Sequence, residues 1–236
     1  MSKGETIVVF GGSSGIGRAV VLAAVAAGAR VRAIGRDRGR LEALLREVPA
    51  LEIATADIRD AEAVGRALEG LARIDHVVVS AGTVTATPIL TSDMSALREP
   101  FNERVFGVMH VVRHAAPRMR DGSFLFVTGD LVERPVAGVS AVGAAAAAVE
   151  SLVRCWALEL APLRFNIISP GSIDTPLHDK LFGAERDKAL AHQAERIPLK
   201  RVGRAEEVAQ AALALLGNRF VTGATLNIDG GLRLAP

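Results

Sequence analysis

Short apolar runs alternate along the chain with longer segments in which apolar residues recur at helical spacing. The first run, Thr6–Phe10 (TIVVF), is β-branched and almost entirely apolar, which is typical of a central parallel strand covered on both faces. A helix is predicted over residues 15–28, with Gly28 as its C-terminal cap. The other predicted strands are 29–34, 51–54, His76–Val79, 124–127, 165–168 and Thr225–Ile228. The other predicted helices are 39–48, 60–71, 93–117, 142–160 and 205–216.

Strictly alternating strands and helices with short connections predict a mostly parallel sheet with helices on both faces. The fold class is therefore α/β, a single doubly wound Rossmann-type domain. No change in composition and no Gly/Ser linker divides the chain, so we expect one domain over residues 1–236. The polar segment 175–204 shows the least regularity, and we expect a mobile insertion between a strand and a helix.

A glycine-rich turn follows the first predicted strand directly and opens the first predicted helix. It reads Gly11-Gly12-Ser13-Ser14-Gly15-Ile16-Gly17. Gly11 permits the tight turn, Gly15 lets the backbone approach a pyrophosphate, and Gly17 lets helix and strand pack closely. The helix N-terminus would present its free N–H groups to the phosphates. Because the pattern lies at a strand–helix junction, it predicts a dinucleotide site.

The end of the second predicted strand indicates which dinucleotide is bound. An acid there would accept hydrogen bonds from a ribose 2′-hydroxyl and repel a 2′-phosphate. This strand instead runs into Arg36, followed by Arg38 and Arg40. A guanidinium offers forked donors to a phosphate, so NADP(H) is preferred over NAD(H). Two alternatives stay open, an ordinary solvated basic turn and a ribose contact made by Asp37.

The 236-residue chain contains no tyrosine, and this absence bears directly on the possible mechanisms. Its lysines are Lys3, Lys180, Lys188 and Lys200. Any mechanism that needs a phenol, or a lysine between residues 3 and 180, is excluded. The 28 basic and 26 acidic residues leave a formal charge of +2, which is too small and scattered to imply a nucleic-acid partner.

Cysteine and histidine predict no metal site. Cys155 is the single cysteine, and its apolar helical surroundings predict a buried, inert thiol. His110 and His114 lie one helical turn apart without a third ligand. We find no secretory h-region and no apolar run of membrane-spanning length, so we expect a cytoplasmic protein without a membrane partner.

Together these motifs resemble the short-chain dehydrogenase/reductase family over essentially the whole chain. The family's Thr-Gly-x-x-x-Gly-x-Gly corresponds to residues 10–17, with Phe10 in the Thr position. Its Asn-Asn-Ala-Gly corresponds to residues 79–82, which read Val-Ser-Ala-Gly. Its Pro-Gly segment matches residues 166–176 closely, and its C-terminal signature begins with Arg-Val-Gly-Arg at 201–204.

The resemblance also implies which residues surround the cofactor. Asp57 and Ile58 should border the adenine, and the backbone of residues 80–82 should contact the ribose. Pro170, Gly171, Ile173 and Thr175 should line the nicotinamide and diphosphate. The complete predicted cofactor site is Gly11, Ser13, Ser14, Gly15, Ile16, Gly17, Arg36, Asp57, Ile58, Ser80, Ala81, Gly82, Pro170, Gly171, Ile173 and Thr175.

The same resemblance implies a catalytic set that this chain lacks. In the family a Tyr moves the proton, a Lys four residues later lowers the pKa of that phenol, a Ser polarises the substrate carbonyl and an Asn supports a water relay. The Tyr and Lys positions hold Val142 and Ala146, the Ser position Gly129 and the Asn position Arg104. We therefore expect a divergent member in which the usual mechanism is absent.

Few groups could replace the missing set. Thr128 could polarise a carbonyl or merely close its strand. Asp130 could act as a general acid or base if buried, or only make a turn hydrogen bond. His178 titrates in a useful range but is commonly a solvated loop residue. Arg104 cannot transfer a proton, yet it could reach beside Ala146 and hold the ribose or a substrate anion.

Three functions remain open. The first is an NADP(H)-dependent oxidoreductase acting on the carbonyl or alcohol group of an unidentified small molecule. The second is a non-catalytic cofactor-binding protein, such as a sensor or partner subunit. The third is a non-redox lyase or isomerase that reuses the cleft. By resemblance, the apolar faces of helices 93–117 and 142–160 should pack subunits together, so a homodimer or homotetramer is expected.

Overall fold

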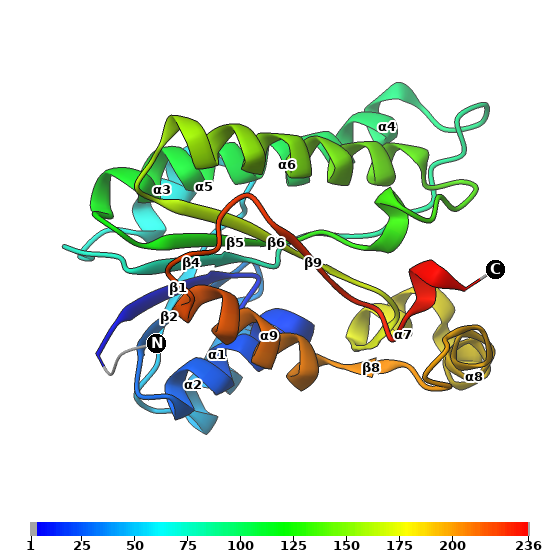
Figure 1. Ribbon diagram of the computed structural model, residues 1–236, viewed down its shortest axis with the longest axis horizontal. Coiled ribbons are helices and arrows are strands. Elements are labelled where there is room, and N and C mark those ends of the chain that lie inside the picture. The colour runs from blue at the N-terminus through cyan, green and yellow to red at the C-terminus, as the bar shows by residue number, and fades with distance from the viewer. Residues whose placement is uncertain (1–3, 236) are drawn as a thin grey trace.

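Seven parallel strands form the central sheet, in the order β3-β2-β1-β4-β5-β6-β9 (Figure 1). The computed structural model describes residues 4–235, and residues 1–3 and 236 of the predicted domain lie outside them. The predicted parallel α/β sheet is confirmed. The strands are β1 (Thr6–Phe10), β2 (Arg30–Gly35), β3 (Glu52–Thr55), β4 (His76–Val79), β5 (Ser123–Val127), β6 (Arg164–Pro170) and β9 (Thr225–Ile228).

Helices cover both faces of this sheet (Figure 1). In the view of Figure 1, α3, α5 and α6 lie above the sheet, and α1, α2 and α9 lie below it. Their bounds, with that of α4, are α1 (Gly15–Ala26), α2 (Arg38–Glu47), α3 (Ala61–Ala67), α4 (Met94–Phe101), α5 (Gly107–Ala115), α6 (Ser140–Glu159) and α9 (Ala205–Gly217).

Each face of the sheet has its own apolar core. On one face Trp156 of α6 packs with the rings of Phe126 and Phe165. On the other face Val20 of α1 and Val208 of α9 are fully buried in a cluster with the strands. Since both faces are covered, the central strands β1, β4 and β5 are buried over almost their whole length, as the sequence pattern predicts, whereas the edge strand β3 exposes Glu52 and Thr55.

Strand order reverses at β1, and this reversal positions the candidate site. β1 pairs with β2 on one side and with β4 on the other. The loops that leave the carboxyl ends of β1 and β4 therefore diverge to opposite faces of the sheet and leave a crevice between them. Ligands of open α/β sheets bind in such a crevice.

Two predicted helices differ from the observed ones. The segment 93–117 is not one continuous α-helix, because a π-helical turn, Asn102–Phe106, separates α4 from α5. Pro100 lies inside α4 and has no N–H to donate, directly before that turn. The helix predicted over 60–71 ends at Ala67, a few residues before Gly70, whose φ of 76° belongs to the left-handed region.

The expectation of an irregular insertion over 175–204 is wrong. This segment forms α7 (Pro176–Phe182) and α8 (Arg186–Arg196), joined through Gly183 at a φ of 52°. The sequence does not indicate α8 because most of that helix is exposed and only Leu190 of it is buried. A helix with one buried residue shows no recurring apolar positions. The two-stranded sheet of β7 (Ile173–Asp174) and β8 (Gly203–Arg204) closes the base of the segment.

The prediction of a buried Cys155 is also wrong. Val153 and Trp156 face the core, and the helical period turns Cys155 outward, where it is exposed. By length and composition alone, the 20-residue helix α6 is apolar enough to cross a membrane. In this fold its apolar side packs on the sheet through Val149, Val153 and Trp156.

Candidate functional site

The glycine turn lies at the carboxyl end of β1, where it brings bare backbone into the crevice. Gly11 and Gly15 have φ values of 81° and 52°, which L side chains rarely adopt. A Cβ at Gly11 would lie 2.7 Å from the backbone N of Ala81, and one at Gly17 would lie 2.2 Å from the backbone O of Gly11. The Ser14 side chain does not cap α1, so the first N–H groups of the helix stay open to a ligand.

A cleft of 820 Å³ runs over this turn and along the carboxyl ends of the strands. It is lined by every residue of the predicted cofactor site except Gly17 and Asp57. Gly17 instead packs α1 against the turn, and the side chain of Asp57 is engaged with Arg59. The residues matched to the family's four catalytic positions, Arg104, Gly129, Val142 and Ala146, also lie on its walls. So do the three replacement candidates, Thr128, Asp130 and His178.

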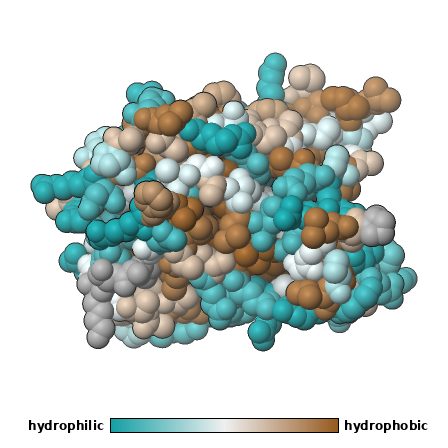
Figure 2. Space-filling model, in the orientation of Figure 1, coloured by the Kyte–Doolittle hydropathy of each residue, from teal (hydrophilic) through white to brown (hydrophobic). Residues whose placement is uncertain are grey.

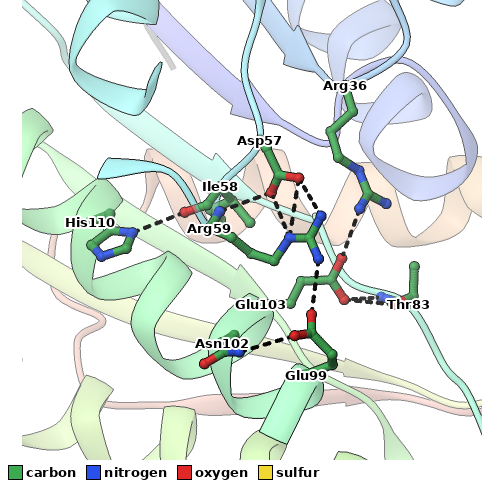
Figure 3. Close-up of polar contacts among 9 residues, drawn as sticks. All are labelled: Arg36, Asp57, Ile58, Arg59, Thr83, Glu99, Asn102, Glu103 and His110. Atoms are coloured by element: carbon green, nitrogen blue, oxygen red, sulfur yellow. Dashed lines mark hydrogen bonds and ion pairs between the residues drawn. The ribbon is translucent and has the colours of Figure 1, made fainter. Parts of the chain in front are cut away.

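One end of the cleft holds a charged cluster (Figure 3). Arg36 follows β2, and its Nη1 lies 3.7 Å from Oε1 of Glu103. Glu103 is buried, and its Oε2 accepts hydrogen bonds of 2.7 Å from both the backbone N–H and the hydroxyl of Thr83. The carboxylate is therefore fixed by Thr83, and the guanidinium of Arg36 remains half exposed at the mouth of the cleft.

Asp57 belongs to a second part of the same cluster (Figure 3). Its Oδ2 accepts a hydrogen bond of 2.6 Å from Nη2 of Arg59, whose Nη1 also donates to Glu99 at 2.9 Å. The hydrogen bond from Arg59 lowers the pKa of the Asp57 carboxyl, and the charge of Arg36 acts in the same direction. Asp57 therefore orders this wall of the cleft as a carboxylate, without itself lining it.

Arg104 lies under the loop that follows β4. Its Nη2 donates a hydrogen bond of 3.0 Å to the backbone O of Thr83, and a Cβ at Gly82 would lie 2.9 Å from its Nη1. Its Nε is buried and has no hydrogen-bond partner among the described residues. Burial lowers the pKa of this guanidinium, although the neighbouring Glu103 opposes the change. The π-helical turn thus presents a desolvated cation to the cleft.

One wall of the cleft carries Val142 and Ala146, the residues that the sequence resemblance matches to the family's Tyr and Lys. Val142 and Ala146 of α6 are 1% and 3% exposed and offer only hydrocarbon. Thr128 lies beside them, and its hydroxyl is 3.4 Å from Oε1 of Glu150. Burial raises the pKa of Glu150, and the hydrogen bond from Thr128 partly offsets that rise.

Asp130 also lines the cleft. It follows Gly129 and opens a short 3₁₀ turn, Asp130–Val132. Burial raises the pKa of its carboxyl, while the positive charge of Arg134 pulls it down. Asp130 is partly buried, so the condition set for it as an acid–base group is met in part.

His178 does not lie in a solvated loop. It is 7% exposed, lies in α7, and stacks on Phe182 with ring centroids 5.9 Å apart. Its Nδ1 is buried without a hydrogen-bond partner among the described residues. The loop interpretation failed because the helical character of 176–182 was not recognised in the sequence.

Several lining residues were not predicted from the sequence. Glu103 precedes Arg104 directly, and that adjacency is the one signal that could have drawn attention to it. Lys180, Gln193 and Arg196 line the far end of the cleft from α7 and α8. These three residues could not be predicted to line the cleft, because the sequence pattern does not indicate that α7 and α8 are helices.

The histidines of α5 do not meet at a common point. Nδ1 of His110 lies 3.1 Å from the backbone O of Ile58, whereas His114 packs against Gly65 of α3. In the described range, residues 4–235, no group of three or more His, Cys, Asp or Glu side chains is arranged to hold a metal ion.

Comparisons with known proteins agree with this architecture. A family model described as enoyl-(acyl carrier protein) reductase matches residues 11–233. The L-xylulose reductase of Mus musculus is 33% identical over 236 residues, with 97% of this chain and 96% of that protein covered. A short-chain dehydrogenase/reductase structure from Brucella melitensis superposes with a TM-score of 0.91 at 28% identity, covering 98% of this chain and 97% of that one.

One further structure is similar in a way that concerns the cleft. It is a short chain oxidoreductase from Pseudomonas aeruginosa PAO1, described as NADPH-bound and as containing an atypical catalytic center. It superposes with a TM-score of 0.88 at 31% identity, and 98% of each chain is covered. Fold, motifs and relatives agree over nearly the whole length, and the chain belongs to the short-chain dehydrogenase/reductase family.

Proposed function

We propose that this protein binds NADP(H) across the carboxyl ends of its strands and acts as an oxidoreductase on a carbonyl or alcohol group of a small molecule. When bound, the cofactor supplies or accepts the hydride. The carrying observation is that one cleft is lined both by the glycine turn and by the polar groups Asp130 and His178. A bound nucleotide and a reacting substrate would therefore share one enclosed space.

The preference for NADP(H) rests on the charges that follow β2. Arg36 and Arg40 both line the cleft, and the guanidinium of Arg36 is half exposed there. Asp37, the acid that would compete for a ribose hydroxyl, is already engaged. Its Oδ1 caps α2 by accepting from the backbone N–H of Arg40 at 3.0 Å, and its Oδ2 lies 3.3 Å from Nε of Arg40. A 2′-phosphate would meet two cations at this position.

A replacement for the missing phenol is part of the proposal. Val142 and Ala146 cannot exchange a proton, and the sequence contains no tyrosine. We assign proton transfer to Asp130, acting directly or through a water. As the hydride bonds to the carbonyl carbon, the carbonyl π pair moves to oxygen, and that oxygen takes the proton of the Asp130 carboxyl. The carboxylate regains a proton from solvent afterwards.

Asp130 suits that role because its surroundings favour the protonated form. Burial raises the pKa of the carboxyl, so a larger fraction carries a proton near neutrality than for a solvated aspartate. Arg104 would contribute differently, by holding an anionic part of cofactor or substrate, since a guanidinium does not release a proton near neutral pH. Both side chains line the cleft.

A protein that binds the cofactor without turnover is the second candidate. It is favoured by the purely hydrocarbon wall at Val142 and Ala146. In that case the cleft would serve as a sensor or as part of a partner complex. The same experiment separates the two candidates.

The test combines binding with turnover. NADPH and NADH are titrated separately into the purified protein and followed by nicotinamide fluorescence, and a panel of ketones and aldehydes is then screened for NADPH consumption. Tight NADPH binding with turnover of one substrate class supports the oxidoreductase. Binding without turnover on any substrate supports the second candidate. No uptake of either nucleotide overturns both.

We also propose self-association through the helices on the α6 side of the sheet. Met94 of α4, Phe106 of the π-helical turn and Leu158 of α6 are exposed apolar side chains, at 62%, 53% and 85% exposure. Pairing of two copies through this side would cover them. Sedimentation velocity distinguishes a homodimer or homotetramer from a monomer.

A further inference from the structure

The cleft continues beyond the predicted cofactor positions, under α7 and α8. Leu177, His178, Lys180, Leu181 and Phe182 line it from α7, and Gln193 and Arg196 line it from α8. Neither the glycine turn nor the 2′-phosphate position uses these residues. In Figure 2 the surface over α8 is largely hydrophilic, while hydrophobic residues gather nearer the centre of the same face.

Two polar atoms at this end are buried without a partner. Nδ1 of His178 and Oε1 of Gln193 have no hydrogen bond within the described part of the chain. His178 is 7% exposed as a residue, so water does not reach it freely. Buried polar groups are almost always hydrogen-bonded, so both atoms point to a ligand or water in the cleft. Nδ1 of His178 can donate to an anion, whereas Oε1 of Gln193 accepts only from an N–H or O–H group.

The acids of the α7–α8 segment do not neutralise its cleft-lining cations. Arg186 engages Asp174, Asp179 and Asp187 together, the last two through contacts of 2.8 Å. Lys180 and Arg196 form no ion pair with any residue between 4 and 235. Two cations at the α7–α8 end of the cleft are therefore available to an anion.

The acids that line the cleft each have a cation nearby. Among the described lining residues, Glu103 lies 3.7 Å from Arg36, Asp37 lies 3.3 Å from Arg40, and the positive charge of Arg134 acts on Asp130. Many of the other lining side chains are apolar. They include Leu131, Val136, Val139, Val142, Leu177, Leu181, Phe182 and Leu232.

We propose that the α7–α8 end of the cleft is an anion subsite, and that the substrate is an apolar carbonyl compound with a carboxylate or phosphate at its far end. Lys180 and Arg196 bind the anion, Nδ1–H of His178 donates a hydrogen bond to it, and the apolar side chains that line the cleft hold the chain between anion and carbonyl. In calling the ligand a substrate, this inference rests on the proposed function. The presence of the anion subsite itself does not require turnover.

The test uses unreactive probes of equal chain length. Octanoate, octyl phosphate and octanol are titrated calorimetrically into the protein at pH 7.5 and low salt, with and without saturating NADP⁺. We expect both anions to bind at least about tenfold more tightly than octanol, since two charge-assisted contacts are involved. The stronger of the two anions identifies the group as carboxylate or phosphate.

Variants locate the binding. The Lys180→Ala/Arg196→Ala double variant should lose about tenfold in affinity for the preferred anion while octanol binding stays the same. The Lys180→Arg/Arg196→Lys variant keeps both charges and should retain most of the affinity. Lys188→Ala is the matched control, because Lys188 lies on α8, pairs with Glu185 and does not line the cleft. Unchanged thermal unfolding and NADPH binding show that the variants fold.

Two results would overturn the subsite. One is anion binding no tighter than that of octanol. The other is a loss in the double variant no greater than that in Lys188→Ala. The proposed function fails separately: a chain that takes up octanoate through Lys180 and Arg196 but binds no nucleotide keeps the subsite and loses the redox role.

Discussion

Arg36 and Glu103, 67 positions apart in the sequence, lie with Nη1 and Oε1 3.7 Å from each other at one end of the cleft. The carboxylate is buried and fixed by Thr83, whereas the guanidinium is half exposed. Glu103 therefore orients a cation without occupying all of its donors, since a guanidinium carries five N–H groups.

Replacing Arg36 should separate the two nicotinamide nucleotides. We expect Arg36→Ala to weaken NADPH binding by about 10- to 100-fold, the effect of losing a hydrogen bond to a charged group, and to leave NADH nearly unchanged. Fluorescence titration measures both. Arg38→Ala is the control, because Arg38 is highly exposed, pairs with Glu42 and does not line the cleft. Equal losses for both nucleotides would contradict a 2′-phosphate contact.

Arg104 should contribute directly to the binding of NADPH or of an anionic ligand. We expect Arg104→Ala to weaken binding of NADPH or of an anionic ligand by about 10- to 100-fold. Arg104→Lys, which keeps the charge, should restore part of that loss. If calorimetry shows unchanged affinity for both ligands in Arg104→Ala, the side chain serves only to hold the backbone O of Thr83.

Asp130→Asn should lower the turnover rate and raise the thermal stability of the protein. We expect turnover to fall at least about 100-fold, within the usual range for a general acid, without loss of NADPH binding. The folded-state pKa of Asp130 is raised by burial, so its stabilising contribution is lost as pH rises through that pKa. The variant should therefore unfold at a higher temperature than the unmodified chain at pH 7, and the difference should shrink as pH falls to about 3. A variant with full turnover would remove Asp130 from the chemistry.

Glu207 should make the fold sensitive to acid. It accepts from the backbone N–H of Arg204 at 2.8 Å and from Arg201, and these contacts lower its pKa from 4.5 to about 2. A lowered pKa contributes stability that is complete above pH 4.5 and is lost between pH 4.5 and about 2. Glu207→Gln should be less stable than the unmodified chain at pH 7 and equally stable near pH 2. Glu206→Gln, on the same helical turn, should leave the denaturation profile unchanged.

Most of the fold could be predicted because burial on both faces imposes a uniform pattern. β1, β4 and β9 have the predicted bounds, and β1 and β4 are short, fully buried and mostly apolar runs. The segment 175–204 could not be predicted in this way. α8 has one buried residue, Leu190, so too few apolar positions recur to reveal the helix. The π-helical turn at Asn102–Phe106 has no periodic signal of its own.

Part of the candidate site could likewise be predicted from the sequence, and part could not. The backbone cradle could be predicted, because Gly11 and Gly15 need conformations that other residues rarely adopt. The contacts of Glu103 and His178 could not, since each depends on a neighbour distant in the sequence or on a helix that was not recognised. For both residues, the burial that sets their chemistry could not be predicted from the sequence.

The outward position of Cys155 on α6 has a practical consequence. It is the chain's sole thiol and it is exposed, so a maleimide dye would attach at one known place without any engineering. Two copies that pair across α6 would shield that thiol, and the labelling rate would then fall as protein concentration rises. A stopped-flow reading of this reaction would report association directly, on the native polypeptide.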